Sequence, residues 1–250
     1  MPALSTAVIV LRAVNYGEAD RVVTLFGREI GRVSALARSA RKSQRRFAGG
    51  LGLGAVGVAA LRERPGAEML TLESFDATGA THVALGTDVV RLAHASYAAE
   101  LVTKLCAPRQ AEPAVYDWLA EMLERLAAGT ATAERLRVFE MGLLRNLGFQ
   151  PVVDHCAVCG TVDPAAPFRW DPDRGGAICA GCARSGRPIA PATRAALVRL
   201  ERLSLAEADA ISLAGDVNRG CREALSEIIN QHISGPLKSL EFIAKLSQSQ

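Results

Sequence analysis

Short apolar runs separated by turn residues fill the first third of the chain. Five such runs of strand length, rich in β-branched or alternating apolar residues, precede residue 80, and glycine-containing turns join the first three. The runs cover Ala7–Ala13, Asp20–Phe26, Arg32–Ala37, Val56–Leu61 and Glu68–Phe75. Five short strands with no helical period between them predict a small barrel of the OB type over residues 1–80. The stretch 37–50, between the third and fourth strands, should then be an exposed loop.

The spacing of apolar residues changes to a helical period beyond residue 86. Thr87 or Asp88 is suited to cap a first helix, which should end before Pro108. The helices predicted after it cover Pro113–Gly129, Ala133–Leu147, Pro191–Leu203, Asp216–Ile233 and Leu237–Leu246. We therefore expect an α+β protein of more than one domain, in which a helical domain over residues 81–250 follows the barrel.

Two pairs of cysteines interrupt the helical region. Each pair has the spacing C-x-x-C, and 19 residues separate the pairs, as in sites where four thiolates hold one zinc ion. The expected ligands are Cys156, Cys159, Cys179 and Cys182. Proline and glycine between the pairs predict a ribbon inserted at about 152–187. Four cysteines leave no open position for water, and no βαβ pattern supports a redox pair, so the zinc should be structural.

Positive charge is concentrated in the predicted barrel. The chain has 49% hydrophobic and 22% charged residues, an ordinary globular composition, and a net charge of +3. Residues 1–80 hold 11 Lys or Arg against 7 Asp or Glu, whereas residues 81–250 hold 18 against 19. Seven cations and one anion lie in Arg28–Arg46. Such a cluster is the footprint of a polyanionic partner, and the alternative is a solvated loop that only aids solubility.

Neither a cofactor motif nor a catalytic pair stands out. Gly52–Gly57 satisfies G-x-G-x-x-G, but a polar loop precedes it and a strand follows it, which a dinucleotide site does not allow. None of the four histidines is followed by an acid or nucleophile that makes a recognisable pair, so we expect no enzyme. His155, next to Cys156, is a fallback metal ligand. No apolar run approaches membrane-spanning length, and the first residues lack a basic leader pattern. A cytoplasmic protein is the expectation.

The order of basic barrel, helices, cysteine ribbon and final helices resembles the RecO family of bacterial recombination-mediator and DNA-repair proteins. The matching motifs are Tyr16–Asp20 (YGEAD), Gly31–Ala37 (GRVSALA), Arg41–Leu51 (RKSQRRFAGGL), Phe139–Phe149 (FEMGLLRNLGF), Cys156–Gly160 (CAVCG) and Gly235–Ser239 (GPLKS). The resemblance spans nearly the whole chain, and the second cysteine pair matches the zinc-bearing members. The glycine-rich segment Leu51–Gly57 departs from the bulkier residues usual in the family.

This resemblance implies a DNA-binding protein without enzymatic activity. Such proteins bind single- and double-stranded DNA, anneal complementary strands and, with RecR, displace single-strand-binding protein so that RecA can load. The residues expected to contact DNA are the cations Arg32, Arg38, Arg41, Lys42, Arg45 and Arg46, together with Phe47 as a base-stacking ring. We expect charge to dominate over stacking, because few aromatic side chains are available.

The resemblance also implies that the acidic tail of single-strand-binding protein docks on the helical domain. We expect its site in an apolar groove between the first and third predicted helices, with Arg135, Arg137 or Arg145 at the rim. The alternative function is that of a zinc-ribbon transcription or translation accessory factor. Such a factor should place its cations on the ribbon, but residues 156–182 hold two arginines against three aspartates.

Overall fold

The computed structural model describes residues 4–43, 45–47, 49–162 and 167–248, and its contacts divide the chain into two compact units. The barrel unit comprises residues 1–131 and 236–250, and the ribbon unit comprises residues 132–235. The barrel ends at Ala77, and the first helix begins at Thr81. The helices up to residue 131 pack with the barrel in one unit. The chain then forms the ribbon unit and returns to the barrel unit at residue 236.

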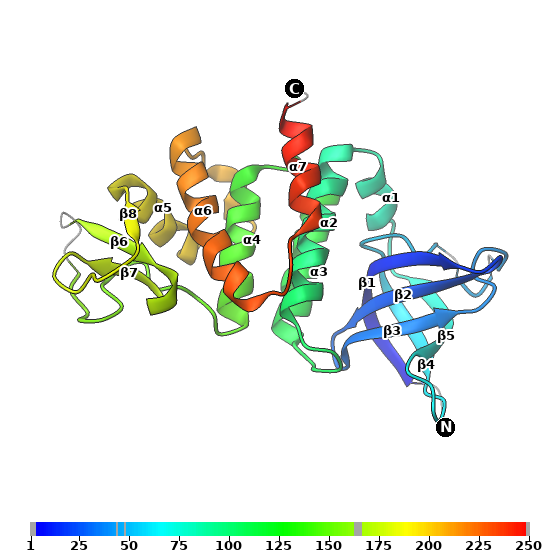
Figure 1. Ribbon diagram of the computed structural model, residues 1–250. Helices are drawn as coiled ribbons and strands as arrows, with labels where there is room; N and C mark the ends of the chain where they lie inside the picture. Colours follow the sequence, from blue (N-terminus) through cyan, green and yellow to red (C-terminus); the bar gives the residue numbers. More distant parts are fainter. Residues whose placement is uncertain (1–3, 44, 48, 163–166, 249–250) are drawn as a thin grey trace. The chain divides into compact units, whose positions relative to one another are not determined.

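A closed barrel of five strands forms the first part of the barrel unit (Figure 1). Its strands are β1 (Leu4–Tyr16), β2 (Asp20–Gly27), β3 (Gly31–Ala37), β4 (Val56–Arg62) and β5 (Leu70–Ala77). They follow one another around the barrel in the order β1-β2-β3-β5-β4, with β1 pairing β4 to close it. Only β3 and β5 pair in parallel. The five-stranded OB-type barrel is therefore confirmed.

Alternation along the strands fills the barrel with small apolar side chains. Val8 and Val10 of β1 face inward with Val23 and Leu25 of β2, and all four are fully buried. Gly57 of β4 has a packing role, since a Cβ there would lie 2.3 Å from the carbonyl oxygen of Asp76. The G-x-G-x-x-G motif thus leads into a barrel strand rather than the helix that a dinucleotide site requires.

Among the residues that the structure describes, four helices belong to the barrel unit, namely α1 (Thr81–Gly86), α2 (Val89–Leu105), α3 (Pro113–Ala128) and α7 (Lys238–Gln248). Asp88 caps α2 as predicted, because its side chain accepts hydrogen bonds from the N–H groups of Val90 and Arg91. Helix α1 is too short to produce a helical period and was not predicted. Helix α7 packs against α2 (Figure 1). Its first turn is held by the Glu100 carboxylate, which accepts from the backbone N–H groups of Lys238 at 3.0 Å and Ser239 at 2.8 Å.

The barrel is fastened to these helices at the turn between β2 and β3. Arg28 makes a bidentate ion pair with Asp117 of α3, with both N–O distances at 2.9 Å. Gly31, with φ of +66°, passes so close to the loop after α2 that a Cβ would lie 1.9 Å from the carbonyl oxygen of Gln110. This end of the barrel is therefore committed to intramolecular packing.

The described part of the ribbon unit, residues 132–162 and 167–235, contains three helices and a small antiparallel sheet. The helices are α4 (Ala133–Asn146), α5 (Pro191–Arg202) and α6 (Gly215–His232), and the strands β6 (Phe168–Asp171), β7 (Gly176–Cys179) and β8 (Arg187–Ile189) pair in the order β7-β6-β8. Short 3₁₀ turns occur at Pro172–Arg174 and Glu207–Ala210. The sheet lies between α4 and α5 along the chain, which confirms the inserted ribbon. Among the helices described, none is both long enough and apolar enough to cross a membrane.

Candidate nucleic-acid interface and metal centre

The four paired cysteines converge at one end of the ribbon. The sulfur atoms of Cys156, Cys159, Cys179 and Cys182 all lie within 4.8 Å of one another. Those of Cys159 and Cys179 are 3.7 Å apart, too far for a disulfide. Ligands 2.3 Å from a tetrahedral zinc would be about 3.8 Å apart, and the 3.7 Å separation of the Cys159 and Cys179 sulfurs matches this distance. The predicted pairing of the two C-x-x-C motifs is confirmed.

Two tight backbone turns aim these sulfurs at one another. The N–H of Gly160 donates to the carbonyl of Cys156, and the N–H of Cys182 donates to that of Cys179, at 2.9 and 3.0 Å. Gly160 has φ of +74°, a conformation that glycine adopts without strain. Each C-x-x-C motif therefore forms a knuckle, and the N–H of Cys179 joins the two by donating to the Cys156 sulfur at 3.4 Å.

The electrostatics of the cluster favour a bound cation. Burial raises the pKa of the Cys156 thiol, but backbone N–H groups pointing at its sulfur outweigh that effect and bring the pKa to about 6. Hydrogen bonds with the sulfurs of Cys159 and Cys179 raise the pKa of Cys182 to about 12. Once some of the thiols ionise, like charges so close therefore keep another protonated. A divalent metal ion would allow all four to be thiolates together.

The basic loop, residues 38–47, connects β3 toward β4 at one end of the barrel. Five of its cations are exposed, namely Arg38, Arg41, Lys42, Arg45 and Arg46. Within the described ranges, none of the five forms an ion pair with a carboxylate. Their positive charge is therefore available to an anionic ligand, in agreement with the predicted exposure of this stretch.

Several hydrogen bonds attach the basic loop to the barrel. The N–H of Ser39 donates to the Asp20 carboxylate at 2.7 Å, and the N–H of Arg41 donates to the carbonyl of Ala19 at 3.0 Å. At the other end, the carbonyl of Arg46 accepts from the N–H of Phe75 at 2.9 Å. The cations are thus displayed on an anchored loop, so less conformational entropy is lost when a ligand binds.

Phe47 does not present its ring for base stacking, and this expectation was wrong. Its side chain is only 5% exposed and belongs to the apolar core of the barrel, with Arg46 lying over the ring 5.3 Å from its centre. A base cannot stack on a ring that the protein already covers. No periodic pattern of apolar residues surrounds Phe47, so its burial could not be predicted from the sequence.

Arg32 also has a structural role. It lies near the start of β3, and six residues of extended chain place it about 20 Å from Arg38 at the other end. Its half-buried guanidinium donates to the carbonyl of Cys106 at 3.2 Å. We therefore remove Arg32 from the predicted DNA contacts.

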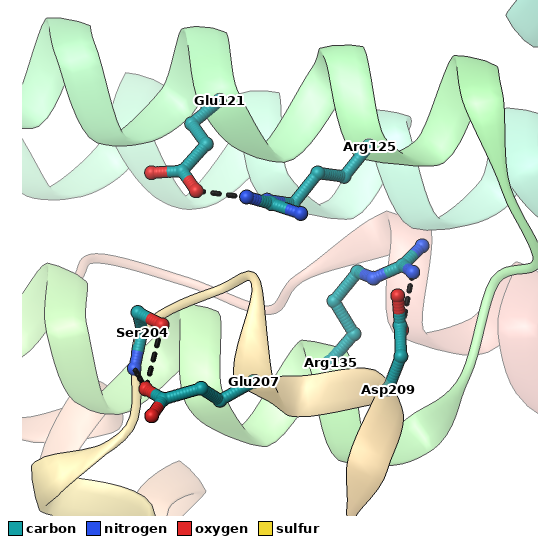
Figure 2. A network of polar contacts seen from close by, with 6 residues as sticks. All are labelled: Glu121, Arg125, Arg135, Ser204, Glu207 and Asp209. Carbon is teal, nitrogen blue, oxygen red and sulfur yellow. Dashed lines mark hydrogen bonds and ion pairs between the residues drawn. The ribbon is translucent and has the colours of Figure 1, made fainter.

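Two of the three arginines predicted to receive an acidic peptide are buried instead. Arg137 is 3% exposed and forms an ion pair with the fully buried Glu140 at 2.9 Å. Arg135 is 2% exposed and pairs with Asp209, as Figure 2 shows. Only Arg145 stays exposed, donating to the carbonyl of Glu201 at 3.0 Å. The first and third predicted helices, now α2 and α4, lie in different units, so this pair forms no groove within either unit.

Two arginines of the ribbon contact its own backbone. Arg169 donates to the backbone carbonyls of Ser185 and Gly186, and Arg174 donates to that of Cys182 at 2.9 Å. Both therefore help to shape the ribbon. Sequence reasoning missed another group of cations, Arg12, Arg21, Lys104 and Lys238, which line one groove of the barrel unit. They come from distant parts of the chain, and no local spacing links them.

Comparison with known proteins agrees with these features over nearly the whole chain. Residues 1–80 match the family described as Recombination protein O N terminal, and residues 86–241 match Recombination protein O C terminal. A protein of an Anaeromyxobacter species, named DNA repair protein RecO, is 43% identical over 240 residues, which cover 94% of this chain and 93% of the relative. Proteins with that name from Geobacter sulfurreducens and Myxococcus xanthus are each 34% identical, over 96% and 95% of this chain and 96% of each relative. The barrel, the helices and the cysteine ribbon are thus those of a protein that belongs to the RecO family.

Proposed function

We propose that this protein is a recombination mediator in DNA repair, which binds DNA and catalyses no covalent reaction. It binds single- and double-stranded DNA through the basic loop and anneals complementary strands. With RecR it displaces single-strand-binding protein, so that RecA loads onto the exposed strand. The observation that carries the proposal is the set of five exposed cations on an anchored loop of an OB-type barrel. Membership of a family whose relatives are named for DNA repair supports it.

Charge accounts for the expected mode of binding. Lysine and arginine side chains that neutralise phosphates release counterions, which gives affinity without sequence preference and a steep dependence on salt. Burial of Phe47 removes base stacking from the basic loop, so phosphate contacts dominate there. Cations that screen the phosphates of two strands on one surface promote annealing without a chemical step.

We further propose that the cysteine cluster holds a structural zinc ion. The four thiolates would close its coordination sphere, and the metal would hold the two knuckles together. This site contributes stability rather than reactivity, since no position is left for water or substrate. The alternative function as a ribbon-based transcription or translation factor is disfavoured, because residues 156–182 hold two arginines against three aspartates, whereas the basic loop displays five exposed cations.

The proposed protein partner is the acidic C-terminal tail of single-strand-binding protein. Arg145 of α4 remains the candidate cation for that tail, because Arg135 and Arg137 are buried. Contacts with RecR and, indirectly, RecA belong to the same proposal. The expected place of action is the cytoplasm, on the nucleoid.

Removal of the loop cations tests the proposal. Replacing Arg41, Lys42, Arg45 and Arg46 together by Ala should weaken DNA binding and annealing while the barrel stays folded. If each cation meets one phosphate of single-stranded DNA, the slope of log affinity against log salt falls by about 0.7 per contact, or about 3 in all. The measurement is equilibrium binding of fluorescent oligonucleotides at several salt concentrations, with thermal melting to check the fold.

Two further variants make that test specific. Arg41 and Arg46 also donate to the carbonyls of Glu18 and Arg38, so the pair Lys42→Ala and Arg45→Ala removes charge without touching these contacts. Its slope should fall by about 1.4. The matched control replaces the exposed cations Arg199, Arg202, Arg219 and Arg222 of the ribbon unit by Ala. Wild-type affinity and salt slope in the loop variants would show that the basic loop only aids solubility.

A further inference from the structure

A cationic groove of about 910 Å³ lies on the barrel unit and is lined by residues outside the basic loop. One wall comes from β1 and the start of β2, and the other comes from α2 and the first turns of α7. The segment 51–53, which precedes β4, also contributes to its lining. All these elements belong to one compact unit, so the groove is part of a single packed structure.

The groove carries a marked excess of positive charge. Its lining contains four cations, Arg12, Arg21, Lys104 and Lys238, and one carboxylate, that of Glu100. Arg12 and Arg21 form no ion pair with any residue that the structure describes. Glu100 is occupied by the first turn of α7, where it accepts from two backbone N–H groups and from the Ser239 hydroxyl at 2.5 Å. The single anion is therefore committed to the fold.

The groove is continuous with the basic loop. Arg21 pairs across β2 and β3 with Ala37, the last residue before the basic loop, and across β2 and β1 with Asn15 in the groove. On the other side, the loop is followed within a few residues by Leu51–Leu53, which line the groove. Both chain connections of the basic loop thus lead directly to this groove.

Part of the remaining groove lining is apolar or aromatic and is therefore suited to contact nucleobases. Ala13 and Leu53 supply partly exposed apolar surface, and Phe242 of α7 is 40% exposed at the groove. Aromatic and apolar faces of this kind accept nucleobases of any sequence, while neighbouring cations accept the phosphates. An exposed ring at this place also supplies what the buried Phe47 cannot supply in the basic loop.

We propose that this groove binds a second segment of the same single DNA strand, which runs from the basic loop past Arg21 to Arg12 and Lys238. The inference rests on the proposed function and extends it, since it assigns the strand a path along the barrel unit. A peptide rich in acidic and apolar residues has similar chemistry. Continuity with the basic loop favours the DNA strand, because five further cations continue the same track.

A length series of single-stranded oligonucleotides tests the path. The variant replaces Arg12 and Lys238, both exposed, by Gln, and the control replaces the exposed Arg64 and Arg219 by Gln. One OB fold covers about 4–16 nucleotides, so we compare thymidine oligomers of about 8 and about 25 nucleotides. The groove variant should bind the short oligomer like the wild type and the long one more weakly. Its salt slope for the long oligomer should fall by about 1.4 for two lost contacts.

The outcomes separate this inference from the proposed function. If the wild type binds neither oligomer, the proposed function itself fails. A second outcome concerns the groove alone. Suppose the wild type binds both oligomers and the loop variant loses affinity. If the groove variant then matches the control variant in affinity or in salt slope for the long oligomer, only the groove path is wrong. The path is also overturned if the groove variant keeps full affinity for DNA but has a lower affinity for a short peptide of Asp and Phe residues. The groove would then be a peptide site.

Discussion

The basic loop and the ribbon unit use their polar side chains in opposite ways. In the basic loop, the cations point outward and none is paired with a carboxylate within the described residues. In the ribbon unit, Arg135 and Arg137 of α4 are buried against carboxylates, and the cysteine sulfurs face one another. The sequence analysis assigned cations of both regions to anionic partners, DNA for the basic loop and an acidic peptide for Arg135, Arg137 or Arg145. The difference teaches that burial and pairing, rather than the number of arginines, distinguish a binding surface from an internal framework.

Loss of one cysteine should give the largest effect and would break the comparison if it altered DNA binding. Cys159→Ser removes a ligand from the proposed zinc, and structural zinc sites contribute about 10–16 kcal/mol of apparent binding energy. We expect loss of metal by elemental analysis and a strongly destabilised ribbon unit by thermal melting. The control, Cys221→Ala, removes a cysteine outside the cluster and should keep its zinc. The zinc site would be refuted if the well-folded wild-type protein contained no zinc and Cys159→Ser left its stability unchanged.

Breaking the buried ion pair of α4 comes next. Arg137→Ala removes the guanidinium that is paired with the buried Glu140 carboxylate, and breaking a buried ion pair from one side costs about 3–5 kcal/mol of unfolding free energy. Urea denaturation measures this loss. Replacing both residues by apolar ones, with Arg137→Met and Glu140→Leu, should recover much of it, because no charge is then left buried. A stable Arg137→Ala protein with reduced affinity for an acidic peptide would restore Arg137 as a binding residue.

The smallest effect is expected from a substitution of Phe47. It tests whether the basic loop binds DNA through charge alone. Phe47→Leu keeps an apolar side chain in the barrel core and should cost about 1 kcal/mol of stability. Affinity for single-stranded DNA should not change, because the ring is covered. If Phe47 instead stacked on a base, the substitution would weaken binding by about 1–3 kcal/mol. Oligonucleotide titration at fixed salt distinguishes these results.

Local sequence patterns predicted most of the fold. Features that depend on residues far apart in the chain were not predicted. Strand alternation located the five barrel strands, and the spacing of four cysteines located the metal cluster. The partner of Arg135 lies 74 residues away, so no local pattern identified its burial. Arg137 and Glu140 are three residues apart on one helix, and that spacing was an available indication of an ion pair.

The candidate DNA-binding residues likewise include some that the sequence could predict and some that it could not. The cations of the basic loop are consecutive enough to be recognised in the sequence, and their exposure agrees with the prediction. The groove cations come from β1, β2, α2 and α7, which only the folded barrel unit brings together. A site assembled from four distant segments has no sequence spacing by which to find it.

The return of α7 to the barrel unit has a consequence for synthesis of the protein. Residues 236–250 leave the ribosome after the whole ribbon unit, at a translation rate of about 5–20 residues per second. Until then, the surface of α2 around Glu100 lacks the helix that covers it. The unit that begins first is therefore completed last. Exchange of the ribbon unit between relatives would likewise need two junctions, one near residue 131 and one near residue 236.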